Sequence, residues 1–381
     1  MLSKFFNLVK NQDKIGEPPW NYDFLYYLNE KEYHKYLEKI YYVKTGKKID
    51  LTPPKGFYEA ENSESFGGGD FSRFKFNFRS RLKTFNEKIQ WIKLYGITPL
   101  MRICTDKVNV RDFVSDCIGA EYLKPVLQII PNCHCERSEA IRPIENKITV
   151  DCHADTEITL SIRNDNNDDT DAPYRDNDVS TYFDQINWEK LPNAFVIKCA
   201  HGCKWHYIIR DKKDFLNNKR LFDIVKRNIT GWLEQEFFPY EGFELQYKGM
   251  QPKLLIEPFM KENRLIEVYC FNGIPKVFAD IHLDNGIKIC TYNEDFSYAD
   301  LVLKPEDKEL MQNFPADKIL KQSIDLSKKL SKDFRFVRVD WMCHEDKLYF
   351  EELTFTPYSG FSGFDKKWNL KMGSWINLEG V

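Results

Sequence analysis

The sequence predicts an α+β protein whose C-terminal half contains antiparallel hairpins. Residues 194–199 and 206–210 are two apolar, strand-forming runs that a short turn separates. Asn272 and Gly273 form a dipeptide that favours a tight turn between two strands. Residues 316–331 carry apolar side chains at every third or fourth position, which predicts an amphipathic helix beside these hairpins. Hairpins and helices combined in this way are typical of the α+β class.

Length and composition are those of a folded chain of two or three domains. The chain has 381 residues, of which 42% are hydrophobic and 30% are charged, so it is neither disordered nor embedded in a membrane. The net charge of -3 argues against a nucleic-acid-binding protein, which needs a basic surface. No apolar run reaches the ~18 residues that a transmembrane helix requires, which leaves only peripheral membrane contact open.

The N-terminus and the cysteines predict a cytoplasmic protein. Lys4, Asn7 and Lys10 interrupt the apolar stretch that a signal peptide would require. The ten cysteines of a chain without an export signal are expected to be reduced thiols.

The first part of the chain divides into a helical region and a segment without periodicity. Residues 22–43 have apolar side chains at helical spacing, which predicts a helix that Gly46 ends. We assign residues 1–51 to this N-terminal helical region. Residues 52–83 contain adjacent prolines and three consecutive glycines and follow neither a helical nor a strand period, which predicts an inserted loop.

A second helical portion and a second loop follow. Residues 84–130 are predicted to be helical, and Thr84 followed by Glu87 has the spacing of a capping box at a helix start. Residues 131–180 end in a nearly continuous polar run rich in Asn and Asp, which cannot bury one face. We therefore expect an inserted polar loop at this point.

Several polar residues stand where the predicted strands end or pair. Lys198 ends a strand just before a glycine-containing turn, where a lysine can reach one phosphate while the turn amides hold another. Asp340 and Glu352 lie on the two strands of one hairpin, an arrangement that can hold magnesium against nucleotide phosphates. Arg338 and Thr354 lie two residues from these acids and share their face by strand alternation.

Each of these residues also has an ordinary structural explanation, because lysines at strand ends and acids across hairpins are usually paired with opposite charges. Their order along the chain is more informative. A strand ending in Lys198, a strand ending in Glu257 before an apolar linker, and then Asp340 and Glu352 follow the layout of an ATP-grasp enzyme.

The chain resembles the teichuronopeptide-biosynthesis (TupA-like) ATP-grasp family. The matching segments, in order, are residues 41–48, 84–95, 105–111, 118–123, 191–202, 270–276, 336–340 and 352–355. The resemblance implies an ATP-grasp fold, in which two α+β lobes clamp ATP. Residues 84–130 would be its N-terminal helical portion, 181–258 its small lobe and 259–381 its C-terminal lobe. The segments 52–83 and 131–180 interrupt matching segments, which supports the interpretation that both are insertions.

The resemblance also implies where ATP and magnesium bind. The ATP phosphates would be held by Lys107, Lys198 and the turn that contains His201 and Gly202. The adenine would lie against Glu257 and the backbone of Phe259 and Met260, and Glu267 would reach the ribose. Magnesium would be bound by Asp340, Glu352 and Thr354. Arg338 would steady the transferred phosphoryl group, so Arg338 and Lys198 are the expected catalytic residues.

Two positions depart from the family pattern. The phosphate turn continues as Cys203-Lys204-Trp205, where family members usually carry small residues that let backbone amides approach a phosphate. Thr354 stands where many ATP-grasp enzymes carry Asn. Both departures concern residues that would contact ATP or its metal ion.

The resemblance implies an ATP-dependent carboxylate–amine ligase that forms an acyl phosphate and acts in bacterial capsule, polysaccharide or other surface-polymer biosynthesis. Its acceptor would be a surface-polymer or sugar precursor. Two alternatives stay open. One is a glycosyltransferase of the same pathway, and the other is a catalytically impaired, nucleotide-binding pseudoenzyme.

Overall fold

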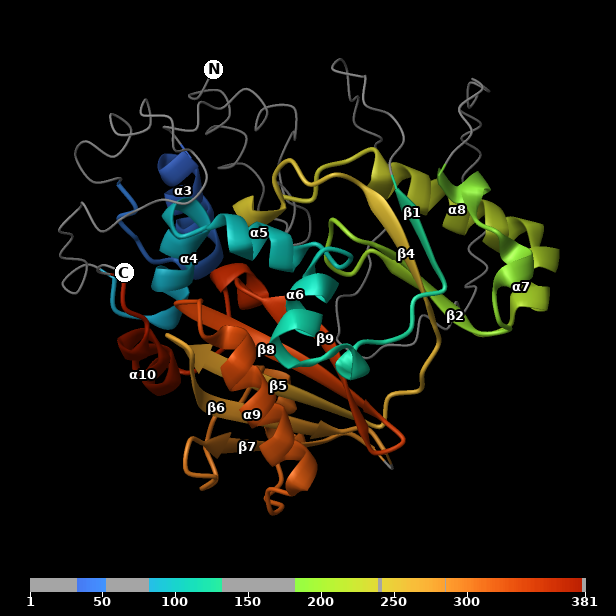
Figure 1. Ribbon diagram of the computed structural model, residues 1–381. Coiled ribbons are helices and arrows are strands. Elements are labelled where there is room, and N and C mark those ends of the chain that lie inside the picture. Colours follow the sequence, from blue (N-terminus) through green and yellow to red (C-terminus); the bar gives the residue numbers. More distant parts are fainter. Residues whose placement is uncertain (1–32, 53–81, 132–181, 239–241, 285, 379–381) are drawn as a thin grey trace.

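The computed structural model describes residues 33–52, 82–131, 182–238, 242–284 and 286–378. Two antiparallel sheets form its centre (Figure 1). The four-stranded sheet has the order β1-β4-β2-β3, with β1 at Gln128–Pro131, β2 at Phe195–Cys199, β3 at His206–Ile209 and β4 at Lys253–Pro258. The five-stranded sheet has the order β7-β6-β5-β8-β9, with β5 at Arg264–Phe271, β6 at Ile274–His282, β7 at Lys288–Asn293, β8 at Phe336–His344 and β9 at Lys347–Thr354.

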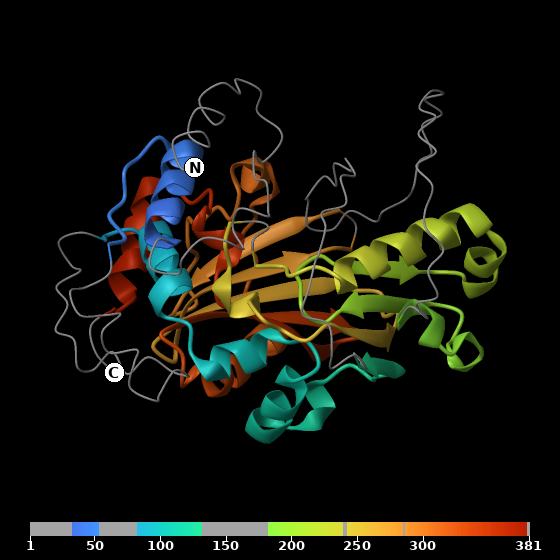
Figure 2. The ribbon, with the colours of Figure 1, turned by 90° about the horizontal axis from the view of Figure 1, so that it is seen from above.

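Helices cover both sheets. They are α3 (Tyr33–Thr45), α4 (Phe85–Tyr95), α5 (Pro99–Thr105), α6 (Val110–Ile118), α7 (Lys212–Asn217), α8 (Lys219–Leu233), α9 (Lys318–Ser331) and α10 (Lys366–Trp375). Figure 2 shows the four-stranded sheet with α7 and α8 extending to one side of the five-stranded sheet. The predicted strands, the hairpin turns and the helix at 316–331 are therefore confirmed.

The four-stranded sheet packs its inner face against α8. Phe195, Ile197 and Cys199 alternate with half-buried residues along β2, and they share one apolar core with Val225 and Ile229 of α8. This alternation is the pattern of a strand with one buried face.

The helical prediction for 84–130 is wrong at its end, because Gln128–Pro131 forms β1 and pairs antiparallel with β4. Ile129 and Ile130 are β-branched and favour a strand. Pro125 and Pro131 flank them, and proline is tolerated at the ends of an edge strand but not inside a helix.

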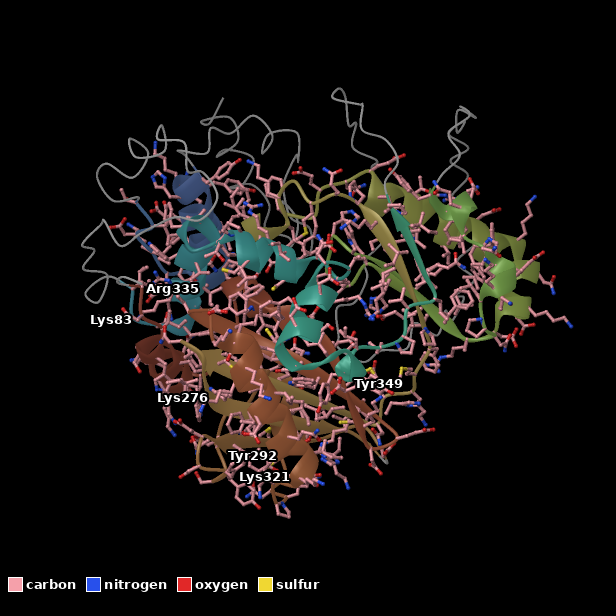
Figure 3. The ribbon with its side chains drawn as sticks, in the orientation of Figure 1. Lys83, Lys276, Tyr292, Lys321, Arg335 and Tyr349 are labelled. Carbon is pink, nitrogen blue, oxygen red and sulfur yellow. The ribbon has the colours of Figure 1, made fainter. Side chains whose placement is uncertain are left out.

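The five-stranded sheet is covered on one face by α9 (Figure 1). Leu326 and Leu330 of α9 lie in the same core as Val268 of β5 and Val339 of β8. Figure 3 labels Tyr292 on β7 and Tyr349 on β9, the two edge strands of this sheet. The predicted turn between β5 and β6 has positive φ at Asn272 (50°) and Gly273 (75°), as a tight hairpin turn requires.

The predicted capping box at the start of α4 is present. The Thr84 side chain accepts a hydrogen bond from the Glu87 amide, and the Glu87 carboxylate accepts one from the Thr84 amide. The helix predicted at 22–43 is described from Tyr33 onward as α3, and Gly46 follows it with φ of 67°. Its first residues, and nearly all of the predicted insertions 52–83 and 131–180, lie outside the described residues.

Within the described part of the chain, no helix is both long and apolar enough to span a membrane. The seven cysteines of that part are unbridged thiols.

Candidate active site

The candidate site lies where the two sheets meet. Lys198 at the end of β2 belongs to the four-stranded sheet, and Glu351 of β9 belongs to the five-stranded sheet. Lys198 Nζ lies 2.9 Å from Glu351 Oε1 and 3.0 Å from Glu257 Oε2 of β4. Burial opposes the charge of Lys198, but Glu351 and Glu257 outweigh it and raise the pKa of the ammonium group.

Two further cations complete this charged cluster. Lys124 pairs with Glu351 and lies 3.9 Å from Glu257, and Arg111 Nη1 lies 3.4 Å from Glu257 Oε1. Arg111 also donates a hydrogen bond to the Lys124 carbonyl oxygen, at 2.6 Å. Lys124, Arg111 and Glu351 were not predicted as site residues.

A β-bulge explains why Glu351 faces the cluster. Asp340 pairs with Glu352, but its neighbour Trp341 pairs with Phe350, so Glu351 is the extra residue on β9. Strict alternation would turn Glu351 away from the face that Glu352 occupies, whereas a bulge re-aims the side chain. Burial alone would raise the pKa of Glu351, but Lys124 and Lys198 hold it well below its usual range.

Three carboxylates form a row across the five-stranded sheet. Glu267 of β5 pairs in register with Asp340 of β8, and Asp340 pairs with Glu352 of β9. Arg338 of β8 pairs with Thr354 of β9, two residues along the same two strands. The predicted proximity of Asp340, Glu352, Arg338 and Thr354 is therefore confirmed, and Glu267 joins them.

Hydrogen bonds tie this row together. Arg338 donates to both oxygens of Asp340, from Nε at 2.6 Å and from Nη2 at 2.8 Å. Thr354 Oγ1 lies 2.8 Å from Asp340 Oδ2 and 3.0 Å from Glu352 Oε1. Burial raises the pKa of Asp340 to about 7, although Arg338 acts in the opposite direction.

Glu267 is also tied to Arg338. Its Oε1 lies 3.4 Å from Arg338 Nη1, and Tyr269 donates a hydrogen bond to its Oε2 at 2.8 Å. The rings of Tyr269 and Tyr358 lie 5.9 and 6.0 Å from the guanidinium carbon of Arg338. Arg338 therefore contacts acids through its nitrogen atoms and lies over two aromatic rings. Whether Glu267 reaches a ribose stays a prediction.

The acid row fits magnesium in its donor chemistry. Asp340, Glu352 and Thr354 supply only oxygen ligands, and magnesium is commonly held by one or two carboxylates together with phosphate oxygens. Across the residues that the structure describes, no group of three or more His, Cys, Asp and Glu side chains is arranged to enclose a metal ion. A magnesium ion at this row would therefore depend on the phosphates for part of its coordination.

The turn between β2 and β3 lies close to Lys107 and to the acid row. Lys107 donates hydrogen bonds from its amide to the Ala200 carbonyl at 3.2 Å and from Nζ to the Gly202 carbonyl at 2.6 Å. Burial and the negative charge of Glu352 raise the pKa of the Cys203 thiol in this turn to about 12.

Trp205 folds back over this turn. A Cβ on Gly202 would lie 2.5 Å from Trp205 Cε3, so only glycine fits beneath the ring. The ring stacks on Trp232 at 5.9 Å and contacts Phe237 and His201. The left-handed backbone position of the turn falls on Lys204, at φ of 60°.

His201 is buried beneath the turn. Its Nε2 lies 2.9 Å from the Trp232 carbonyl, and burial lowers its pKa to about 4. The imidazole is therefore neutral at physiological pH and donates this hydrogen bond from Nε2.

The connection between the sheets contains the other predicted nucleotide contacts. The Phe259 amide donates a hydrogen bond to the Ala194 carbonyl at 3.2 Å, so this donor is already used within the protein. The Arg210 guanidinium lies 4.5 Å from the centre of the Phe259 ring. Met260 follows in the connection and is half-buried.

Comparisons with known proteins identify a family for this chain. A family model described as TupA-like ATPgrasp matches residues 155–377, which is more than half of the chain. No curated protein matches at a significant level.

Solved structures with similar folds include D-alanine–D-alanine ligases. The Bacillus anthracis ligase is 17% identical, with 69% of this chain and 62% of that chain covered and a TM-score of 0.31. The Coxiella burnetii ligase is 12% identical, with 76% and 64% covered and a TM-score of 0.36. This chain thus spans less than two thirds of either ligase.

The family match covers strands β2 to β9 and includes the Lys198, Asp340 and Glu352 positions that the sequence singled out. The chain therefore belongs to the TupA-like ATP-grasp family and has the α+β ATP-grasp fold.

Proposed function

We propose that the protein is an ATP-dependent carboxylate–amine ligase that acts on a cell-surface polysaccharide or polymer precursor. Membership of the ATP-grasp family supports the reaction class. The observation that carries the proposal is the contact between Lys198 and Glu351, 2.9 Å apart. This contact lies between the β2–β3 turn, which we propose to bind phosphate, and the acid row of the other sheet.

The proposed nucleotide contacts follow from the positions of the residues. Lys198 and Lys107 would neutralise ATP phosphates beside the Gly202 turn, and Lys107 already holds that turn by its carbonyl. Glu257, with Phe259 and Met260 behind it, would lie at the adenine end. Because the Phe259 amide is already bonded to Ala194, the adenine contacts of this connection would come from its remaining backbone groups.

The acid row would hold magnesium through Asp340, Glu352 and Thr354. When bound, the ion would offset the negative charge of the phosphates. Arg338 would orient the transferred phosphoryl oxygens, and its pairing with Asp340 fixes the guanidinium in place.

The proposed reaction needs no nucleophilic side chain. A substrate carboxylate oxygen attacks the γ-phosphorus of ATP, the bond to the β-phosphate oxygen breaks, and ADP leaves. An amine then attacks the acyl carbon, phosphate leaves with the bonding electron pair, and the amine loses a proton. Positioning and charge neutralisation by the residues above would supply most of the rate enhancement.

One observation favours a nucleotide-binding pseudoenzyme as a second candidate. Trp205 occupies the inner side of the turn, where its ring packs on Gly202. A bulky side chain there limits how closely backbone amides approach a phosphate. The glycosyltransferase alternative has no comparable support.

The test is a thermal shift of the full-length protein with Mg-ATP, with ATP plus EDTA, and with Mg-UDP-glucose. A ligand that binds only the folded state raises the melting temperature. We expect a shift with Mg-ATP that is lost in Asp340→Ala and kept in Asp325→Ala, an exposed acid on α9. A shift with Mg-UDP-glucose alone would favour the glycosyltransferase.

A second assay separates the ligase from the pseudoenzyme. Candidate carboxylic acids are incubated with Mg-ATP and hydroxylamine, which converts an acyl phosphate into a hydroxamate. Hydroxamate formation that depends on the acid establishes the ligase. If Mg-ATP binds but no ADP is released in the presence of any of the acids, the pseudoenzyme is favoured.

A further inference from the structure

A strained turn follows the acid row in the chain. Tyr358 and Ser359, four and five residues beyond Thr354, both have left-handed backbone angles, with φ of 52° and 51°. This conformation is disfavoured for residues with a Cβ and persists only where surrounding groups hold it. Two consecutive residues of this kind beside the candidate site call for a structural cause.

Helix α4 supplies that cause. Asn86, Gln90 and Lys93 are spaced by four and three residues, so they lie on one face of the helix. All three polar side chains are buried, and Gln90 and Lys93 have no exposed surface. Buried polar groups are costly unless they are hydrogen-bonded, so their partners show what this face does.

All three side chains bond to the chain just after the acid row. Lys93 Nζ donates to the Ser359 carbonyl at 2.8 Å and to the Gly242 carbonyl at 2.6 Å. Gln90 Nε2 donates to the Ser359 and Gly360 carbonyls at 3.2 and 2.9 Å. Asn86 exchanges hydrogen bonds with the backbone of Ser362.

The Gln90 side chain also packs closely against the backbone of this turn. Gly360 has φ of 72°, and a Cβ there would lie 2.6 Å from Gln90 Nε2. Gln90 thus reaches the backbone at a position that tolerates no side chain.

The turn carries Tyr358 to the candidate site. Its ring lies 6.0 Å from the guanidinium carbon of Arg338, which holds Asp340. A shift of the turn would therefore uncover Arg338 and change one wall of the acid row.

We propose that Asn86, Gln90 and Lys93 are positioning residues, which hold the 358–362 turn so that Tyr358 covers Arg338. This inference deepens the proposed function, because it assigns a fixed wall to the site where the second substrate would meet the phosphoryl group. It also gives a role to residues 84–95, which the acid row and the phosphate turn leave without one.

The experiment measures how fast phenylglyoxal, an arginine reagent, modifies Arg338 in the full-length protein, with peptide mass spectrometry as the readout. Lys93→Met removes the donors while keeping the side-chain length. We expect Arg338 modification to rise at least about fivefold, the change produced by roughly 1 kcal/mol in the equilibrium of the turn. Arg264, which is buried in the same sheet, is the internal standard for global opening.

Lys88→Met is the matched control. Lys88 lies on the same helix and is also buried, but its Nζ donates to the Ile376 carbonyl at 2.7 Å, away from the turn. We expect Lys88→Met to leave the ratio of Arg338 to Arg264 modification unchanged. Equal ratios in Lys93→Met and Lys88→Met would overturn the proposal.

A rescue variant distinguishes positioning from loss of stability. Ser359→Gly makes the left-handed conformation inexpensive, so Lys93→Met with Ser359→Gly should regain protection of Arg338. Failure of this rescue contradicts the proposal. If Lys93→Met yields no folded protein, Gln90→Leu takes its place. A ratio of Arg338 to Arg264 modification that equals the ratio in Lys88→Met would then overturn the proposal.

These results do not depend on ATP. A missing Mg-ATP shift in the unsubstituted protein, with Arg338 protection that still follows Lys93, would remove the proposed function and leave the positioning role. A normal Mg-ATP shift, with Arg338 protection that is independent of Lys93, would keep the proposed function and remove the positioning role.

Discussion

Glu351 Oε1 lies 2.9 Å from Lys198 Nζ, and this pair joins the five-stranded sheet to the four-stranded sheet. Glu351 also pairs with Lys124, so one carboxylate connects two cations at the junction. Lys198 in turn contacts Glu257. The junction is thus a partly buried charge network, in which each member depends on its partners for compensation.

Lys198→Ala and Asp340→Ala should each reduce ATP turnover at least about 100-fold, because each removes a charged group aimed at the proposed phosphates or their metal. The measurement is ADP release with Mg-ATP and an accepted carboxylic acid. Lys329→Ala, at an exposed position on α9, is the control. Near-normal turnover in either site variant would contradict the assignment of that residue.

Glu351→Gln should lower the melting temperature at pH 7 and flatten its dependence on pH in acid. The folded protein holds the pKa of Glu351 below its ordinary value of 4.5, so the unfolded chain takes up the proton first. The stabilisation is therefore complete above about pH 5 and is lost as the pH falls.

Melting temperatures from pH 7 to pH 3 test this prediction for Glu351. Glu309→Gln, at an exposed acid, should retain the full acid dependence. If Glu351→Gln and the unsubstituted protein lose stability in parallel, Glu351 does not contribute as described.

Gly202→Ala should destabilise the protein by about 1–3 kcal/mol, because the new methyl group would overlap the Trp205 ring. Urea denaturation measures the change. In a Trp205→Leu background the same substitution should cost much less, since the overlapping ring is gone. An equal cost in both backgrounds would mean that the turn does not pack in this way.

Arg264→Met should destabilise the protein by about 3–5 kcal/mol. Arg264 donates to both oxygens of the fully buried Asp280, at 2.7 Å each, and its removal leaves this carboxylate with His282 Nε2, at 3.3 Å, in place of a guanidinium. Lys276→Met breaks an exposed pair with Glu294 and should cost less than about 1 kcal/mol. Urea denaturation measures the free energy of unfolding of both variants. A similar decrease in the two would contradict this prediction.

Local signals in the sequence predicted much of the fold. Strand alternation, the Asn272–Gly273 turn and the capping box at Thr84 depend on neighbouring residues only, and the structure confirms all three. The strand β1 was missed because its four residues are stabilised by pairing with β4, more than 120 residues later in the chain.

The sequence by itself determined which residues can share one face of a hairpin. Asp340 and Glu352 were predicted together because alternation and a short turn place them in register, and the antiparallel pairing of β8 with β9 confirms this. Lys198 was found because it ends a strand before a glycine-containing turn. These features need no information from distant parts of the chain.

Only the tertiary structure decided which charges surround those residues. Glu351 reaches Lys198 because a bulge in β9 breaks the alternation, and Lys124 and Arg111 arrive from a different segment. Gln90 and Lys93 likewise meet a turn that lies more than 260 residues later in the chain. The physical reason is that burial and charge compensation depend on which surfaces meet in space. Local sequence periodicity does not indicate which distant segments will contact one another.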